Sequence, residues 1–166
     1  MGRIRVLAVV LVLGSLLLAP APAAHAGSVW DPNDAAHRLD IRWVGVYQQH
    51  DGLMRVTISF HDRVRLRWFE GRRHPTLIVG LYYAKQRTAE AWDVTFYRNA
   101  HDRLVAKLCE LASSCVSLAR VHHPDATTLR VRLDPFYGPF TGSFFRARSQ
   151  RPGGRVIDRT PWGIVT

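Results

Sequence analysis

The residues with the clearest capacity for chemistry are arginines interleaved with apolar and aromatic side chains. They form a basic run, made up of Arg63, Arg65, Arg67, Trp68, Arg72, Arg73 and His74. In an extended strand Arg63, Arg65 and Arg67 would share one face, because alternate side chains point to opposite sides. Guanidinium groups bind phosphates and carboxylates through their planar forks, and an exposed Trp68 would stack on a sugar ring. The basic run therefore predicts a contact surface for an anionic partner, although an edge strand solvated by its charges has the same pattern.

A second group of residues offers oxygen ligands. Its members are close together in the sequence: Asp31, Asn33, Asp34 and Asp40. Calcium takes several oxygen ligands from carboxylates and amides, so these four residues are a candidate calcium site. The same residues also suit an Asx-turn in which Asp31 and Asn33 flank Pro32. We favour the turn and predict no cofactor, with calcium as the alternative.

Signatures of catalysis are scarce in this chain. The sequence contains no G-x-S-x-G elbow, H-E-x-x-H motif, P-loop or Rossmann fingerprint. A glycosidase needs two carboxylates a few ångströms apart, and the spacing of Glu70, Glu90 and Glu110 does not demand such a pair. His122 and His123 are neighbours, but in a strand they would point to opposite faces and chelate poorly. We therefore expect a binding domain without catalytic residues.

The chain has two cysteines, Cys109 and Cys115. An even pair in an exported protein predicts a disulfide, although a mixed zinc site with His122 and His123 stays open. The segment 104–111 has apolar residues that suit either a strand or a short helix. We favour the strand, because the disulfide would then join two neighbouring strands of a hairpin.

The N-terminal segment has the three parts of a secretory signal peptide. Arg3 and Arg5 supply the positive charge, an apolar stretch runs from Val6 to Leu18, and Ala24-His25-Ala26 offers small residues for cleavage. The apolar stretch would cover about 20 Å as a helix, which is short of the ~30 Å hydrocarbon core of a bilayer. We predict a signal peptide over 1–26, cleavage after Ala26, a secreted domain over 27–166 and no transmembrane segment.

The charge of the mature domain points to anionic partners. The formal net charge of +10 falls to +8 when Arg3 and Arg5 leave with the signal peptide. Such a balance favours contact with nucleic acid, cell-wall phosphate polymers or acidic glycans. Because the secretory route leads out of the cell, we expect an extracellular protein whose main partner is not nucleic acid.

Alternation with a period of two predicts that strands carry the fold. Residues 54–60 place Met54, Val56, Ile58 and Phe60 on one face and Arg55, Thr57 and Ser59 on the other. The alternation of 39–43 changes phase near Val44, as at a β-bulge, and Asp51-Gly52 is typical of a hairpin turn. About eight such strands joined by hairpins predict an all-β fold, a single antiparallel sandwich of jelly-roll type.

Three short segments carry a resemblance to known proteins. They are Trp30-Asp31-Pro32-Asn33-Asp34, Leu39-Asp40-Ile41 and Val56-Thr57-Ile58-Ser59-Phe60. This order resembles the first part of a group of uncharacterised secreted actinobacterial β-sandwich proteins. More distantly it is similar to the DOMON and family 9 carbohydrate-binding-module superfamily. The resemblance covers residues 30 to 62.

That resemblance implies a sandwich that binds a sugar, a haem or a calcium ion at its edge. Haem would require an axial methionine and histidine, and only Met54 suits that role, so haem is not expected. Taken together, the sequence predicts a secreted, non-catalytic binding domain for a glycan or an anionic cell-surface polymer. The alternatives are a secreted hydrolase acting on a glycan or ester, and a protein–protein interaction module.

Overall fold

The structure is a computed structural model of the whole chain. It describes residues 25–34, 39–48, 53–69, 76–82, 90–110, 115–133, 143–151 and 154–166. The apolar stretch of the signal peptide and the Asp51-Gly52 turn lie outside the described residues, so both stay predictions.

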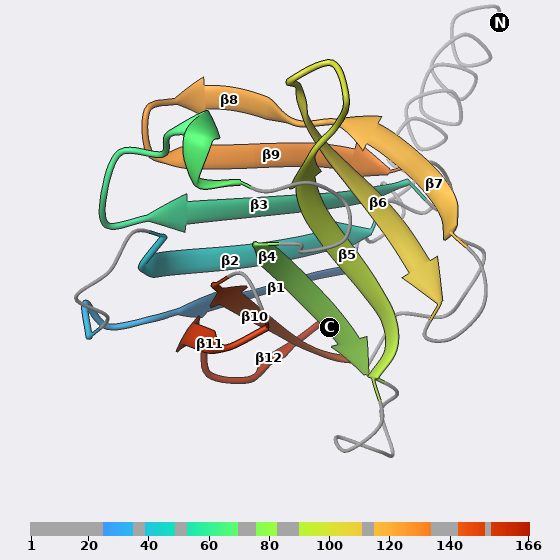
Figure 1. Cartoon of the computed structure of the whole chain (residues 1–166). Helices are drawn as coiled ribbons and strands as arrows, with labels where there is room; N and C mark the ends of the chain where they lie inside the picture. Colours follow the sequence, from blue (N-terminus) through green and yellow to red (C-terminus); the bar gives the residue numbers. More distant parts are fainter. Residues whose placement is uncertain are drawn as a thin grey trace, which may run out of the picture.

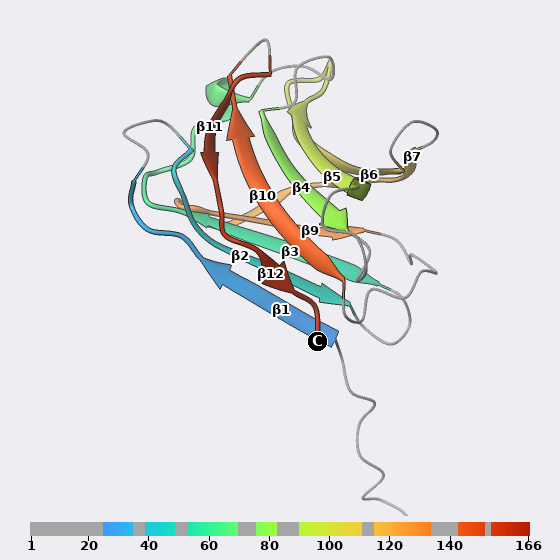
Figure 2. The ribbon, with the colours of Figure 1, turned by 90° about the horizontal axis from the view of Figure 1, so that it is seen from below.

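Two antiparallel sheets pack against each other (Figures 1 and 2). The five-stranded sheet has the order β1 (His25–Trp30), β2 (Ile41–Gln48), β3 (Met54–Phe60), β9 (Thr128–Leu133), β8 (His122–Asp125). The seven-stranded sheet has the order β11 (Val156–Arg159), β10 (Phe144–Gln150), β4 (Leu77–Tyr82), β5 (Glu90–Arg98), β6 (Leu104–Glu110), β7 (Cys115–Arg120), and β12 (Gly163–Ile164) also pairs with β10. The predicted all-β antiparallel sandwich is confirmed.

The described residues form twelve strands, where the sequence predicts about eight. The additional strands are short or lie at sheet edges, where the alternation of apolar and polar residues is weak. One of them, β8, contains Pro124, a residue tolerated in an edge strand because the missing N–H faces away from the ladder. In the part of the chain that the structure describes, no helix has the length and apolar character needed to cross a membrane.

The chain passes between the sheets after β3, after β7 and again after β9. As a result β9 lies beside β3 in one sheet, and β10 lies beside β4 in the other (Figure 1). The register of β3 and β9 pairs Arg55 with Arg132 and Thr57 with Arg130. Residues far apart in the sequence therefore share one surface of the five-stranded sheet.

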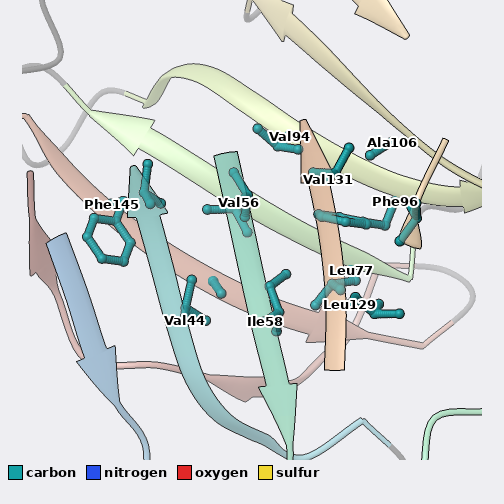
Figure 3. Packing of buried hydrophobic residues seen from close by; sticks show 14 of the residues in the cluster. Val44, Val56, Ile58, Leu77, Val94, Phe96, Ala106, Leu129, Val131 and Phe145 are labelled. Carbon is teal, nitrogen blue, oxygen red and sulfur yellow. The ribbon is translucent and has the colours of Figure 1, made fainter. Parts of the chain in front are cut away.

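The core lies between the two sheets (Figure 3). Val44, Val56 and Ile58 reach it from the five-stranded sheet, and Val94 and Phe96 reach it from the seven-stranded sheet. The predicted orientation of β3 is confirmed, since Ile58 is completely buried and Thr57, on the opposite face, is half-buried.

The predicted change of phase in β2 is a β-bulge. The register between β2 and β3 shifts between Ile41 and Trp43. After the bulge, Val44 and Val46 point into the core, whereas Trp43, Gly45 and Tyr47 alternate with them and point outward. The bulge thus sets the face on which the aromatic side chains of β2 appear.

The segment 104–111 is a strand, as favoured from the sequence, with β6 covering Leu104–Glu110. Cys109 lies opposite Cys115 of β7 in the register of this hairpin, and the two form a disulfide. The predicted disulfide is confirmed, and it joins β6 to β7 in the seven-stranded sheet.

Candidate functional site

The basic run does not form the predicted strand. Residues 66–68 form a 3-10 helix, η1 (Leu66–Trp68), closed by bonds from Trp68 N to Arg65 O and from Phe69 N to Leu66 O, at 2.9 and 3.0 Å. Trp68 and the fully buried Phe69 both pack on the core. A strand would point only one of two neighbouring side chains inward, so tertiary packing overrides the alternating pattern here.

The 3-10 helix changes which side chains of the basic run are exposed to solvent. Arg63, Arg65 and Arg67 are exposed, but strand alternation no longer places them on one face. Trp68 is half-buried against the core, and the guanidinium carbon of Arg65 lies 5.9 Å from the centre of its ring. That ring is therefore not the free stacking platform that the sequence suggested. The rest of the predicted site, Arg72, Arg73 and His74, lies outside the described residues.

The structure assembles a different arginine-rich surface on the outer face of the five-stranded sheet. We use "outer face" for the side chains of β1, β2, β3 and β9 that point away from the core. Cross-strand register arranges them in three rows: Ala26, Tyr47, Arg55 and Arg132; Ser28, Gly45, Thr57 and Arg130; and Trp30, Trp43, Ser59 and Thr128. Directly opposed residues in a sheet lie about 4.5–5.5 Å apart at Cβ, so each row is a continuous strip.

A pocket of about 300 Å³ opens on this outer face. Its lining includes Ser28, Trp43, Gly45, Tyr47, Arg55 and Thr57. Gly45 leaves space for the indole ring of Trp43, which would have to shift if a Cβ were added at this position. The volume is at the lower end of the range for small-ligand sites.

Aromatic rings and guanidinium groups contact one another around this pocket. The ring centres of Trp30 and Trp43 are 6.3 Å apart, and Trp30 is 64% exposed. Arg42 lies over Trp30 and Arg55 over Tyr47, each with its guanidinium carbon 5.7 Å from the ring centre. Such contacts hold the rings and the guanidinium planes in defined orientations.

The electrostatics of the outer face are one-sided. Strands β1, β2, β3 and β9 carry no aspartate or glutamate in their sequences, but they carry Arg42, Arg55, Arg130 and Arg132. Arg55 and Arg132 are directly opposed, and like charges in that position destabilise a sheet. Arg55 Nε is also buried without a hydrogen-bond partner among the described residues. An anion would relieve this concentration of positive charge.

The outer face was not predicted as a site, although its residues carry a local signal. The alternation of 54–60 places Arg55 and Thr57 opposite the core, and Arg130 and Arg132 alternate in the same way with the apolar residues of β9. Their proximity depends on the pairing of β3 with β9, in which Ser59 meets Thr128, 69 residues further along the chain. No local signal predicts that pairing.

The acidic residues gather at the ends of β1 and β11, between the two sheets. Asp31 directly follows β1, and Asp158 belongs to β11 of the other sheet. Carboxylate oxygens of Asp31, Asp34 and Asp158 all lie within 4.8 Å of one another, and we call these three residues the acidic cluster. Asp158 Oδ2 also accepts a 2.6 Å hydrogen bond from the backbone N–H of Ile41, so its carboxylate links β11 to the start of β2.

Burial makes these carboxylates costly to ionise. Asp31 and Asp158 are each 6% exposed and Asp40 is 2% exposed. Burial, with repulsion from Asp158 and Asp34, raises the pKa of Asp31 to about 7. Burial also raises the pKa values of Asp40 and Asp158. Asp31 Oδ2 and Asp40 Oδ1 are both buried without hydrogen-bond partners among the described residues.

The structure revises the predicted set of oxygen ligands. It brings Asp31 and Asp34 together and buries Asp40 close enough for repulsion by Asp158 to raise the pKa of Asp40. Asn33, in the same segment, is exposed. Asp158 was missed, because it lies near the other end of the chain and reaches Asp31 only through the packing of the two sheets.

The predicted cleavage position falls inside β1. Ala26 N donates to Thr166 O at 3.1 Å, and Thr166 Oγ1 donates to Ala26 O at 3.0 Å. Cleavage after Ala26 would remove these bonds and leave the α-amino group of Gly27 at the edge of the pocket. N-terminal sequencing of secreted protein should begin at Gly27; a start at or before His25 would contradict the predicted position.

No protein-family model, curated protein or solved structure matches this chain. The resemblance over residues 30 to 62 therefore stays a prediction, and function has to be argued from the residues themselves.

Proposed function

We propose that this protein is a secreted, non-catalytic binding domain that holds an anionic glycan or cell-surface polymer on its outer face. One observation carries the proposal: the pocket of about 300 Å³ brings Trp43, Tyr47 and Arg55 together on strands without acidic residues. The prediction of an anionic partner is kept, whereas the proposed contact surface moves from the basic run to the sheet.

The chemistry of the pocket suits a sugar. Trp43 and Tyr47 offer flat apolar rings with a polar group at the edge, which suits the apolar face of a sugar ring. The hydroxyl groups of Ser28 and Thr57 in the same lining can exchange hydrogen bonds with sugar hydroxyls. Arg55 adds a planar fork for a carboxylate, sulfate or phosphate group.

The arrangement of the arginines favours a polymer over a small anion. Arg132 is directly opposite Arg55, and Arg130 is opposite Thr57 in the next outward-facing row. The positive charge therefore continues from the pocket onto β9, where Arg130 and Arg132 are exposed. A chain with repeated negative charges would contact all three guanidinium groups at once.

The test compares two triple variants that remove the same charge. R55Q/R130Q/R132Q alters the outer face, and R63Q/R65Q/R67Q alters the basic run as the matched control. Each is applied to isolated cell wall, and to heparin as a defined anionic glycan, and eluted with a salt gradient. Exposed charge contacts weaken as salt screens them, so the salt concentration at elution measures how many contacts each variant retains.

We expect the outer-face variant to elute at a clearly lower salt concentration than the control, which should elute close to the wild type. Melting temperatures measured in parallel check that both variants are folded. Equal losses in the two variants would mean that net charge alone drives retention. A loss confined to R63Q/R65Q/R67Q would return the contact surface to the basic run and overturn the assignment.

A further inference from the structure

The acidic cluster joins two sheets through groups that repel one another when ionised. Asp31 and Asp34 come from the end of β1, and Asp158 comes from β11. Two of the three carboxylates are almost completely buried, which is rare for aspartate unless the charge is compensated. Positive groups reach this region from both sheets: His61, which follows β3, lies near Asp40, and Arg146 of β10 lies near Asp31.

Unpartnered oxygen atoms point to a missing positive ligand. Asp31 Oδ2 and Asp40 Oδ1 are buried and accept no hydrogen bond within the described part of the chain. Native proteins satisfy nearly all such atoms with a donor, a water molecule or an ion. The buried carboxylate of Asp31 thus supplies a sign of a ligand that is independent of the gathering of acidic residues.

We propose that Asp31, Asp34 and Asp158 bind a calcium ion that ties the end of β1 to β11. Calcium–oxygen distances are about 2.3–2.6 Å, so two oxygens bound to one ion lie at most about 5 Å apart. The separations in the acidic cluster, all within 4.8 Å, meet this limit without movement of the backbone. Asp34 is exposed, which leaves room for water molecules to complete the six to eight ligands of calcium.

Magnesium fits this arrangement less well. It requires oxygen distances of about 2.0–2.1 Å in near-ideal octahedral geometry, so its ligands lie within about 4.2 Å of one another. Magnesium also dehydrates reluctantly and is usually held by one or two carboxylates, whereas the acidic cluster offers three. Selectivity for calcium over magnesium is therefore part of the proposal.

A shared proton could also reduce the repulsion within the acidic cluster. Two carboxylates that face each other can share one proton, and Asp31 and Asp158 are close enough to form a hydrogen bond. In that case protons, and not calcium, would stabilise the fold. The experiment has to separate these two outcomes.

The experiment measures the melting temperature of the full mature protein at pH 7.5, first with a chelator and then with calcium or magnesium chloride. A ligand a hundredfold above its Kd raises the melting temperature of a domain of this size by roughly 5 °C or more. We expect that rise with calcium and a smaller rise with magnesium. Asp34→Asn should abolish it, and because Asp34 is exposed this variant should still fold.

Asp62→Asn is the matched control. Asp62 is exposed and lies near enough to raise the pKa of Asp40, but it is not a member of the acidic cluster. It should keep the full calcium response, since it removes a nearby negative charge without removing a ligand. An equal loss of the response in Asp34→Asn and Asp62→Asn would show that general negative charge attracts the ion, and would overturn the site.

Terbium luminescence gives a second readout. Trp30 directly precedes Asp31, so a terbium ion at the calcium site should be sensitised by excitation of tryptophan, and calcium should displace it. A melting temperature that ignores calcium but rises as the pH falls, without displaceable terbium, would assign the acidic cluster to proton sharing and refute the proposal. This test does not depend on binding of a polymer, so either proposal can fail alone.

Discussion

Two regions of this molecule each combine three arginines with an aromatic ring that lies under one of them, and they differ in how the arginines are held. In the basic run, Arg63, Arg65 and Arg67 lie on one short segment whose 3-10 helix is closed by local bonds. On the outer face, Arg55, Arg130 and Arg132 come from two strands joined by a ladder of paired residues. The ladder fixes the positions from which these side chains project, whereas the turn of the basic run places its arginines on no shared face.

The aromatic residues differ in the same way. Trp68 of the basic run packs on the core. Trp43 of the outer face lies across Gly45 and lines the pocket. The two regions thus differ in the direction of the aromatic ring: Trp68 packs on the core, whereas Trp43 lies on the outward side of the sheet.

The largest expected effect is the difference in unfolding free energy between a substitution in the core beneath the outer face and one in the basic run. Ile58→Ala, beneath the outer face, should lower the free energy of unfolding by about 2–5 kcal/mol, because Ile58 is completely buried. Leu66→Ala in the basic run should cost less than about 1 kcal/mol, since Leu66 is 38% exposed. Urea denaturation measures both, with Thr57→Ala as the control on the outward side of β3. Similar costs for Ile58→Ala and Thr57→Ala would show that the assigned register is wrong.

The next effect separates stability from binding. Replacing both Cys109 and Cys115 by serine should lower the free energy of unfolding by about 2 kcal/mol, because a short loop is no longer closed. The disulfide lies in the seven-stranded sheet, so retention on heparin at a temperature where the variant is folded should not change. If retention also falls, elution from heparin depends on the stability of the fold. The salt gradient would then not distinguish the outer face from the basic run as the contact surface.

A smaller effect concerns the two tryptophans. Trp43→Ala should weaken binding to an acidic glycan about tenfold, or about 1.4 kcal/mol, because it removes a wall of the pocket. Trp68→Ala should instead lower the melting temperature and leave the affinity of the folded protein unchanged. Calorimetric titration with heparin oligosaccharides measures the affinities. The reverse result would identify the basic run as the aromatic platform.

The smallest effect is a dependence of stability on pH, measured with a chelator present. The folded pKa of Asp31, about 7, lies above its ordinary value of 3.8. Its contribution to stability is therefore fully present below about pH 3.8 and is lost as the pH rises through about 7. The raised pKa values of Asp40 and Asp158 change stability with pH in the same direction. The other charged groups near these carboxylates are His61, Arg146 and Asp34.

Asp31→Asn tests how much of this pH dependence comes from Asp31. The free energy of unfolding of the wild type should fall between pH 5 and pH 8, and the fall should be smaller in the variant. Since the basic run contains no residue of this group, R63Q/R65Q/R67Q should retain the wild-type slope. A slope that survives Asp31→Asn intact would assign the pH dependence to other groups.

The sequence supports much of the fold, because alternation is a local property. The inward positions of β3, the bulge in β2 and the strand character of 104–111 follow from residues that are neighbours in the chain. The disulfide follows from an even pair of cysteines six residues apart. The strand expected over the basic run was wrong, because burying both Trp68 and Phe69 required a turn that alternation does not anticipate.

Local patterns were enough to identify an antiparallel all-β sandwich with a disulfide-linked hairpin and an excess of positive charge. Which side chains meet depends on how the strands and sheets pack. Arg55 meets Arg132 because β9 pairs with β3, and Asp31 meets Asp158 because the edges of two sheets pack together. Both meetings join residues that are distant in the sequence. Periodicity determines the face on which a residue lies, but it does not determine which strand becomes its neighbour.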